Sequence, residues 1–319
     1  MSTATHNSTA ARQHVPKLTA EGGRLPDFVI VGAPKCGTTT LYQYLLRHPG
    51  IFMSTPKEMS FFSKPEVYAR GFPWYTALFE PAGDDQLCGE ASTTYARWPT
   101  YEGTAERMAD AVPEARLIYL VRNPVDRVYS FYAHRMREQV SAGIDEFLAA
   151  TPEAIHSGLY MSQLDELLRH FPREQLHVLL LDDLKASPQA VIDGVLGFLG
   201  LDSIDLAAEK KIVANQGSGH FAATQSVTRL TGAIKRVPVL GQAVRMVPRG
   251  TRRAAFEWLQ KGPVGRRLKK RHTRQMTSLT PALRRRLYGH FRDDLDRFEA
   301  FLGRDLSHWK EPATGGHGV

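Results

Sequence analysis

The chain has 319 residues, a hydrophobic fraction of 42% and a net charge of +8, which suit one large α/β domain or two modest ones. No apolar run approaches the roughly 20 residues that span a bilayer, so we expect no transmembrane segment. Two cysteines, Cys36 and Cys88, are too few for a disulfide framework or a zinc site.

The N-terminal residues 1–26 are polar and lack periodicity, which indicates a disordered tail. They also lack the apolar core of a signal peptide, so we expect a cytoplasmic protein. We expect a single domain over residues 27–310, followed by a flexible tail over residues 311–319.

The first predicted strand, FVIV, runs directly into the loop GAPKCGTTT and then into a helical pattern. Gly32 and Gly37 have the spacing of a phosphate loop, but Thr38 stands where a nucleoside triphosphatase has its lysine. The lysine of this loop is Lys35, at its rim. Backbone N–H groups at a helix N-terminus attract anions. The loop therefore predicts an anion cradle, although N-capping threonines in a glycine turn are the simpler alternative.

A second strong strand, RLIYLV, ends at Arg122, and the sequence NPVDRVYS follows it. Asn123 and Pro124 predict the start of a helix, and Ser130 lies two turns into it. A guanidinium group binds phosphate well, so Arg122 and Ser130 predict a second phosphate site. Taken alone, Arg122 would fit a surface ion pair.

The remaining elements complete an alternating order. QLCGEAS predicts a short strand that ends at Glu90, and LHVLLL predicts another strand. Helical patterns cover 160–170, 187–199 and 280–302. Strands that alternate with helices indicate a P-loop-like, three-layer α/β fold, with a mostly parallel sheet flanked by helices and a helical C-terminal part. No strong strand ends in an acidic Mg²⁺ ligand, so we expect a metal-free donor with one phosphate in the loop.

These motifs resemble those of sulfotransferases that use 3′-phosphoadenosine 5′-phosphosulfate. PKCGTTTLYQYLLRHP resembles their 5′-phosphosulfate loop, and RNPVDRVYSFY resembles their 3′-phosphate motif. Further segments resemble the heparan-sulfate type or its bacterial members: KEMSFF, GFPWY, GEASTTY, LLLDDLKASPQAVIDGVLGFLGL and GRDLSHW. The resemblance covers about 27–310 and is weakest over 220–275.

The resemblance implies a role for each matched residue. Lys35 would neutralise the oxygen that bridges sulfur and the 5′-phosphate, and Glu90 would act as the catalytic base. Lys57 would assist on the acceptor side. Donor contacts would come from Lys35, Cys36, Gly37, Thr38, Thr39, Thr40, Arg122, Ser130 and Tyr160. For Glu90 a strand-end salt bridge is the alternative, and Tyr160 could simply pack against the sheet.

Function and partners follow from these assignments. We expect transfer of a sulfuryl group to a hydroxyl of a glycan, a glycolipid or a secondary metabolite. An ATP-dependent small-molecule kinase and an inactive module that binds anions or glycans remain alternatives. The range 229–286 carries 17 Lys/Arg and one acid, Glu257. It could dock on an anionic membrane surface or an acidic carrier, or it could be a solvated helical surface. No recognition pattern favours nucleic acid.

Overall fold

The computed structural model describes residues 18–19, 22–137, 143–207 and 277–310. The chain divides into two compact units, Met1–Arg122 with Ser162–Lys210, and Asn123–Met161 with Lys211–Val319. Most of the basic range 229–286, most of the predicted tail 1–26 and all of the predicted tail 311–319 lie outside the described residues, so what was predicted for them stays a prediction.

The first unit contains a sheet of five strands in the order β2-β3-β1-β4-β5, and every pairing in it is parallel. The parallel pairing confirms the predicted α/β class, and each predicted strand is present. The strands are β1 (Phe28–Gly32), β2 (Ile51–Met53), β3 (Leu87–Ala91), β4 (Arg116–Val121) and β5 (Leu176–Leu180). All five residues of β1 are buried, as expected for the centre of a covered parallel sheet.

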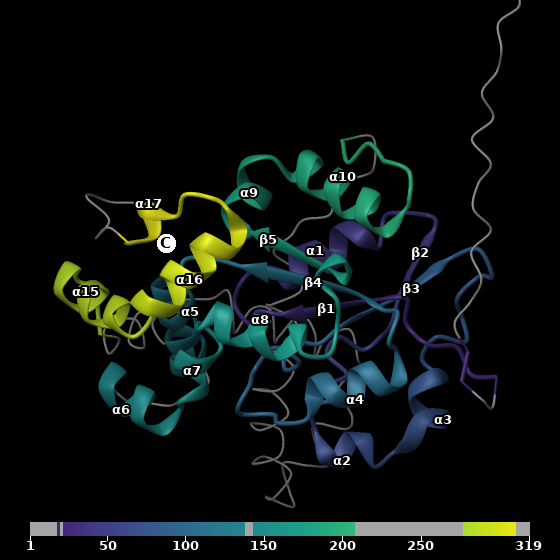
Figure 1. Cartoon of the computed structure of the whole chain (residues 1–319), viewed down its shortest axis with the longest axis horizontal. Helices are drawn as coiled ribbons and strands as arrows, with labels where there is room; N and C mark the ends of the chain where they lie inside the picture. The colour runs from purple at the N-terminus through teal and green to yellow at the C-terminus, as the bar shows by residue number, and fades with distance from the viewer. Residues whose placement is uncertain (1–17, 20–21, 138–142, 208–276, 311–319) are drawn as a thin grey trace, which may run out of the picture. The chain divides into compact units, whose positions relative to one another are not determined.

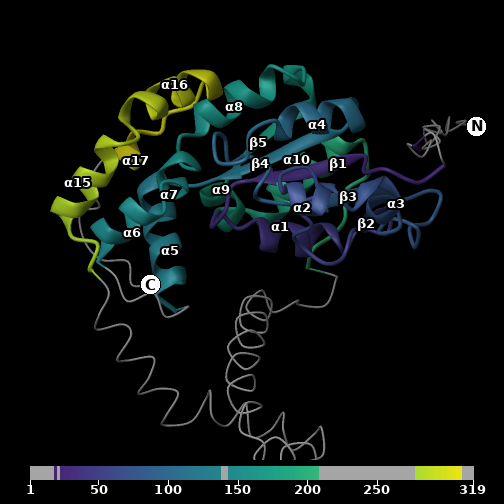
Figure 2. The ribbon, with the colours of Figure 1, turned by 90° about the horizontal axis from the view of Figure 1, so that it is seen from below.

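Helices cover both faces of this sheet. Helix α1 and helix α10 lie on one face, and α4 with the part of α8 from Ser162 onward lies on the other (Figures 1 and 2). The helices are α1 (Thr38–Leu45), α2 (Pro65–Tyr68), α3 (Gly71–Thr76), α4 (Thr104–Ala111), α8 (Tyr160–Leu168), α9 (Leu181–Ala186) and α10 (Pro188–Leu199), with a 3₁₀ turn at Arg173–Gln175.

The second unit is helical in its described residues, as predicted for the C-terminal part. Its apolar core joins α5 to α15, with Val128, Tyr132, Leu287 and Phe291 among its fully buried members. The helices are α5 (Pro124–Arg137), α6 (Ile144–Ala150), α7 (Glu153–His156), α15 (Pro281–Gly289), α16 (Arg292–Leu302) and α17 (Ser307–Lys310).

The predicted continuous helix over 280–302 is wrong in one respect. Thr280 caps the start as expected, since its hydroxyl accepts a hydrogen bond from Leu283 N. The helix then breaks between Gly289 and Arg292, where the N–H groups of His290 and Phe291 bond three residues back. The tighter turn divides the segment into two helices, which bury the apolar residues Leu283, Leu287, Leu295 and Phe298.

Candidate donor and acceptor site

The phosphate loop follows β1 at the carboxyl edge of the sheet. The chain leaves β1 toward β2 on one side, and it leaves β4 toward β5 on the other side. The ends of β1 and β4 therefore flank a topological switch point, which is where open α/β sheets bind ligands. Arg122 follows β4, and its Nη1 donates a 3.4 Å hydrogen bond to the carbonyl of Lys35. The structure thus brings these two predicted residues together.

Two glycines allow the close approaches that the loop requires. Gly37 precedes α1 with φ of 93°, and a Cβ there would lie 2.7 Å from Leu181 Cδ1. A Cβ on Gly32 would lie 2.9 Å from the ring of Tyr119. Lys35 also has a positive φ of 67°, an uncommon conformation for a residue with a side chain. The loop therefore has a sparsely populated backbone conformation, which the surrounding structure must stabilise.

The first turn of α1 is suited to an anion. It contains no acidic residue, and its cap, Gly37, offers no side chain that would occupy the N–H groups. Thr38 is buried, Thr39 is exposed and Thr40 is partly buried. Cys36 is fully buried with its Sγ 3.7 Å from the Pro34 carbonyl, so its backbone rather than its thiol would face a ligand. The donor set fits a phosphate group.

Lys57 and Glu58 lie next to this turn. Lys57 Nζ is 3.5 Å from Thr38 Oγ1 and 3.2 Å from Glu58 Oε1. Glu58 accepts hydrogen bonds from Thr93 N at 3.2 Å and from Thr93 Oγ1 at 2.9 Å, and its side chain is 29% exposed. The pair joins an accessible carboxylate to the phosphate loop. Glu58 lies inside the KEMSFF segment, and its place beside Lys57 was the available sequence signal for it.

Glu90 has a different environment from the one predicted. It is fully buried in β3, and it accepts hydrogen bonds from Ser92 Oγ at 2.7 Å, from Tyr95 Oη at 2.6 Å and from Tyr75 Oη. Burial raises its pKa above the ordinary value, against the opposing effect of the three hydroxyls. No salt bridge to Glu90 forms among the described residues. The carboxylate is thus enclosed by three hydroxyl groups, and its predicted role as base stays a prediction.

Two predicted donor contacts fall in the second unit. Ser130 is a partly buried residue of α5, whose start is capped as predicted: Asn123 Oδ1 accepts hydrogen bonds from Val125 N and Asp126 N. Tyr160 is 1% exposed and packs against Phe298 and Trp309. Tyr160 therefore packs within its own unit, and its predicted contact with the nucleotide stays a prediction.

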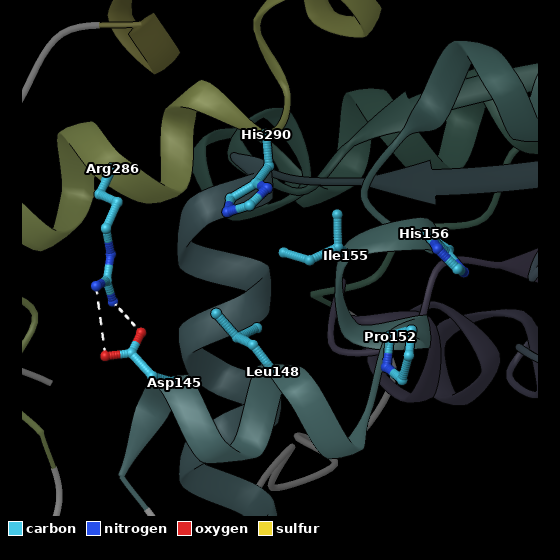
Figure 3. Close-up of a pocket in the computed structure, with 7 residues that line it drawn as sticks. All are labelled: Asp145, Leu148, Pro152, Ile155, His156, Arg286 and His290. Atoms are coloured by element: carbon cyan, nitrogen blue, oxygen red, sulfur yellow. Dashed lines mark hydrogen bonds and ion pairs between the residues drawn. The ribbon is translucent and has the colours of Figure 1, made fainter.

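The second unit also contains a cavity of about 450 Å³. Figure 3 shows the Arg286–Asp145 ion pair at one side of it, with His290, Ile155 and Leu148 across from that pair. The ion pair is exposed, and such pairs contribute little to stability. None of the predicted donor residues lines this cavity, so we do not place the donor there.

The fold and the loop define an α/β protein with a glycine-bearing loop at the carboxyl edge of its parallel sheet. Residues 25–216 match the family model described as the sulfotransferase domain. The chain belongs to this family of transferases. Among the described residues no group of three or more His, Cys, Asp or Glu could hold a metal ion. No described helix is both long and apolar enough to cross a membrane.

Known proteins are similar to the chain in sequence and in structure. It is 31% identical over 198 residues to the human bifunctional heparan sulfate N-deacetylase/N-sulfotransferase 3, which is 56% of this chain and 22% of that protein. The bifunctional heparan sulfate N-deacetylase/N-sulfotransferase 1 of Caenorhabditis elegans is 28% identical over 218 residues, which is 62% of this chain and 25% of that protein. The chain thus spans about a quarter or less of these relatives. The crystal structure of a sulfotransferase from Alicyclobacillus acidocaldarius matches with a TM-score of 0.61 and 28% identity, covering 90% of this chain and 99% of that one.

Proposed function

We propose that the protein transfers a sulfuryl group from 3′-phosphoadenosine 5′-phosphosulfate to a hydroxyl of an acceptor. Membership of the sulfotransferase family supports the reaction class. The observation that carries the site is the Lys57–Glu58 pair, because Lys57 Nζ lies 3.5 Å from Thr38 in the phosphate loop and 3.2 Å from the Glu58 carboxylate. A base and an anion cradle are thereby joined in one unit of the molecule.

The donor would lie with its 5′-phosphate on the first turn of α1. Gly37, Thr38, Thr39 and Thr40 would hold that phosphate through backbone N–H and hydroxyl groups. Arg122 would hold the 3′-phosphate, which has no counterpart in ATP, and the contact expected from Ser130 stays a prediction. When bound, the donor supplies a sulfuryl group whose bond to the 5′-phosphate can be displaced in line.

We assign the base to Glu58 in preference to Glu90. A base must reach the proton that it removes, to within about 2.6–3.2 Å or through one water molecule. Glu58 is partly exposed, whereas Glu90 is enclosed by three hydroxyl groups. Glu90 stays the competing assignment, and the two are separable by mutation.

The steps then follow from the charges. Glu58 accepts the proton of the acceptor hydroxyl as that oxygen forms its bond to sulfur. The bond from sulfur to the 5′-phosphate oxygen breaks, and Lys35 neutralises the charge that develops on that oxygen. Electrostatic help is most effective where charge develops in the transition state. Lys57 orients Glu58 and adds positive charge at the acceptor side. A positioned base typically contributes ~10²–10⁴-fold.

The acceptor class is a glycan, a glycolipid or a secondary metabolite. The relatives are named as heparan sulfate N-sulfotransferases, so a glycan with a free amine belongs in the acceptor panel as well. The range 229–286 could bring an anionic membrane surface or an acidic carrier to the site. We propose a cytoplasmic enzyme, with association at a membrane surface through this range.

Calorimetry and an acceptor panel test the proposal. Adenosine 3′,5′-bisphosphate should bind without metal, and ATP with Mg²⁺ should bind weakly. Tight binding of ATP with Mg²⁺ and none of the bisphosphate would favour a kinase. Incubation with the sulfated donor should increase the mass of an acceptor by one sulfuryl group. Bisphosphate binding without transfer to any hydroxyl or amine acceptor would favour an inactive binding module.

A further inference from the structure

The carboxylate of Glu90 is the centre of a buried polar network. Both of its oxygens are used: Oε1 accepts hydrogen bonds from Ser92 and Tyr95, and Oε2 accepts one from Tyr75. The described residues supply no cation to it. A buried carboxylate without a cation is costly unless donors satisfy it. Keeping such a carboxylate in the core lowers the stability of the fold. We therefore look for a role of Glu90 other than stabilising the fold.

Two of the three hydroxyls connect Glu90 to the neighbouring segment Lys57–Phe62. Ser60 N donates to Ser92 Oγ at 2.9 Å, and Phe62 N donates to Tyr95 Oη at 3.4 Å. A hydroxyl that accepts an amide proton can direct its own proton elsewhere, and here both hydroxyls donate to Glu90. The carboxylate thereby fixes the direction of both chains of hydrogen bonds.

The third hydroxyl belongs to Tyr75, whose ring contacts the same segment. Tyr75 stacks on Phe61 with the ring centroids 4.2 Å apart and the planes at 6°. Glu90 therefore acts on three consecutive residues, Ser60, Phe61 and Phe62. These residues directly follow the Lys57–Glu58 pair and Met59.

The chain after Glu90 holds Glu58 directly. Thr93 follows Ser92, and both its N–H and its hydroxyl donate to the Glu58 carboxylate. Displacement of Ser92 would move Thr93 and Ser60 together. Thr93 is its neighbour in the chain, and Ser60 N donates a hydrogen bond to its hydroxyl, which itself donates to Glu90. The position of Glu58 is thus determined from two sides, and both depend on Glu90.

We propose that Glu90 is a positioning residue for the transfer reaction, which sets the place of Glu58 and Lys57 beside the phosphate loop without touching donor or acceptor. The consequence for catalysis rests on the proposed function. Misplacement of a reacting group by about 1 Å can reduce a rate by ~10²-fold. The consequence for the Lys57–Phe62 segment itself does not depend on that function.

The test compares Glu90→Gln with the wild-type enzyme in two measurements. Glutamine keeps the shape but offers one acceptor oxygen and turns an amide donor toward the hydroxyls. Hydrogen exchange of peptides over 57–63 should become faster, while peptides from β1 should be unchanged. The kcat should fall by ~10- to 100-fold, with the KM for the donor and the affinity for adenosine 3′,5′-bisphosphate unchanged.

A double variant separates positioning from direct catalysis. If Glu90 acts through Glu58, adding Glu90→Gln to Glu58→Gln should cause little further loss of kcat, because coupled residues are not additive. Asp27→Asn is a matched control: Asp27 is another buried carboxylate of the same unit and accepts a 2.7 Å hydrogen bond from Cys88 N at the start of β3. It should alter stability and leave kcat unchanged.

Each contrary result has a distinct meaning. Unchanged exchange over 57–63, or full kcat in folded Glu90→Gln, would overturn the positioning role. Independent, multiplying losses in the double variant would also overturn it and favour Glu90 as the base. If the wild type transferred sulfuryl to no acceptor, the proposed function would fail, while hydrogen exchange would still decide whether Glu90 orders the segment. Should Glu90→Gln not fold, Ser92→Ala and Tyr95→Phe break the two links singly, and each should speed exchange over 57–63.

Discussion

Arg122 and Lys35 are joined across neighbouring strand ends, by a 3.4 Å hydrogen bond from the guanidinium of Arg122 to the backbone carbonyl of Lys35. The contact orients the loop rather than neutralising the lysine. It involves the backbone carbonyl of Lys35 and not its ammonium group. The two residues can therefore be tested for different steps.

We expect Lys35→Met to lower kcat by ~10²- to 10³-fold, because it removes charge stabilisation that is needed mainly in the transition state. Methionine keeps the length of the side chain and the same backbone penalty at a φ of 67°. The affinity for adenosine 3′,5′-bisphosphate, measured by calorimetry, should change little. A variant with normal kcat would contradict the role of Lys35 at the leaving oxygen.

The assignment of the base is decided by Glu58→Gln. Since this change removes the proton acceptor, we expect a loss of kcat of ~10²–10⁴-fold with the affinity for the bisphosphate retained. Thr93→Val is the companion variant, because it removes the hydroxyl that donates to Glu58 at 2.9 Å and keeps the carboxylate itself. A smaller loss is expected there. Full turnover of Glu58→Gln would return the base to Glu90.

Gly37→Ala tests the shape of the loop. An alanine at this position would have to adopt a φ of 93°, and its Cβ would lie 2.7 Å from Leu181 Cδ1. We expect weaker bisphosphate binding and a loss of stability of ~1–3 kcal/mol. The control is Gly194→Ala in the interior of α10, where a Cβ would meet nothing within 4 Å. That variant should gain ~0.5–1 kcal/mol in urea unfolding.

Glu90 should also make stability depend on pH. Burial raises its pKa in the folded state, so the folded protein holds more protons than the unfolded chain between the ordinary pKa of Glu and the raised one. The free energy of unfolding from this group is therefore highest at low pH and falls as pH rises through that window. Urea unfolding of the wild type relative to Glu90→Gln should show this slope. A difference that is flat or rises with pH would contradict the burial effect.

Both cysteines should resist thiol reagents in the native protein. Cys36 and Cys88 are fully buried, and burial raises the pKa of Cys88 to about 12. Because the thiolate is the reactive form, we expect no reaction at neutral pH until the chain unfolds. A colorimetric thiol count before and after adding denaturant measures this. Rapid labelling of the native protein would show that the loop at Cys36 opens.

The strands and the loop could be predicted from the sequence because both are local features. FVIV is wholly apolar, and the glycine spacing after it is set by the turn that the chain must make. Asn123 could be predicted as a cap for the same reason, since its partners are two and three residues away.

The environment of Glu90 could not be predicted in this way. Its burial depends on Tyr75, Tyr95 and Ser92, and the Tyr75 contact lies 15 positions away. Tyr160 is a similar case, because its ring packs against residues of α16 and α17 that are distant in sequence. A resemblance identifies a motif, but the packing decides which carboxylate in it is accessible.

The network around Glu90 has a practical consequence for engineering. Exchanging the KEMSFF segment alone with that of a relative would leave Ser92, Tyr95 and Thr93 facing unmatched partners, and unsatisfied buried polar groups each cost about 1–3 kcal/mol. The segments 57–62 and 89–95 therefore form one exchangeable module. Chimeras intended to redirect this enzyme to new acceptors should carry both segments from the same parent.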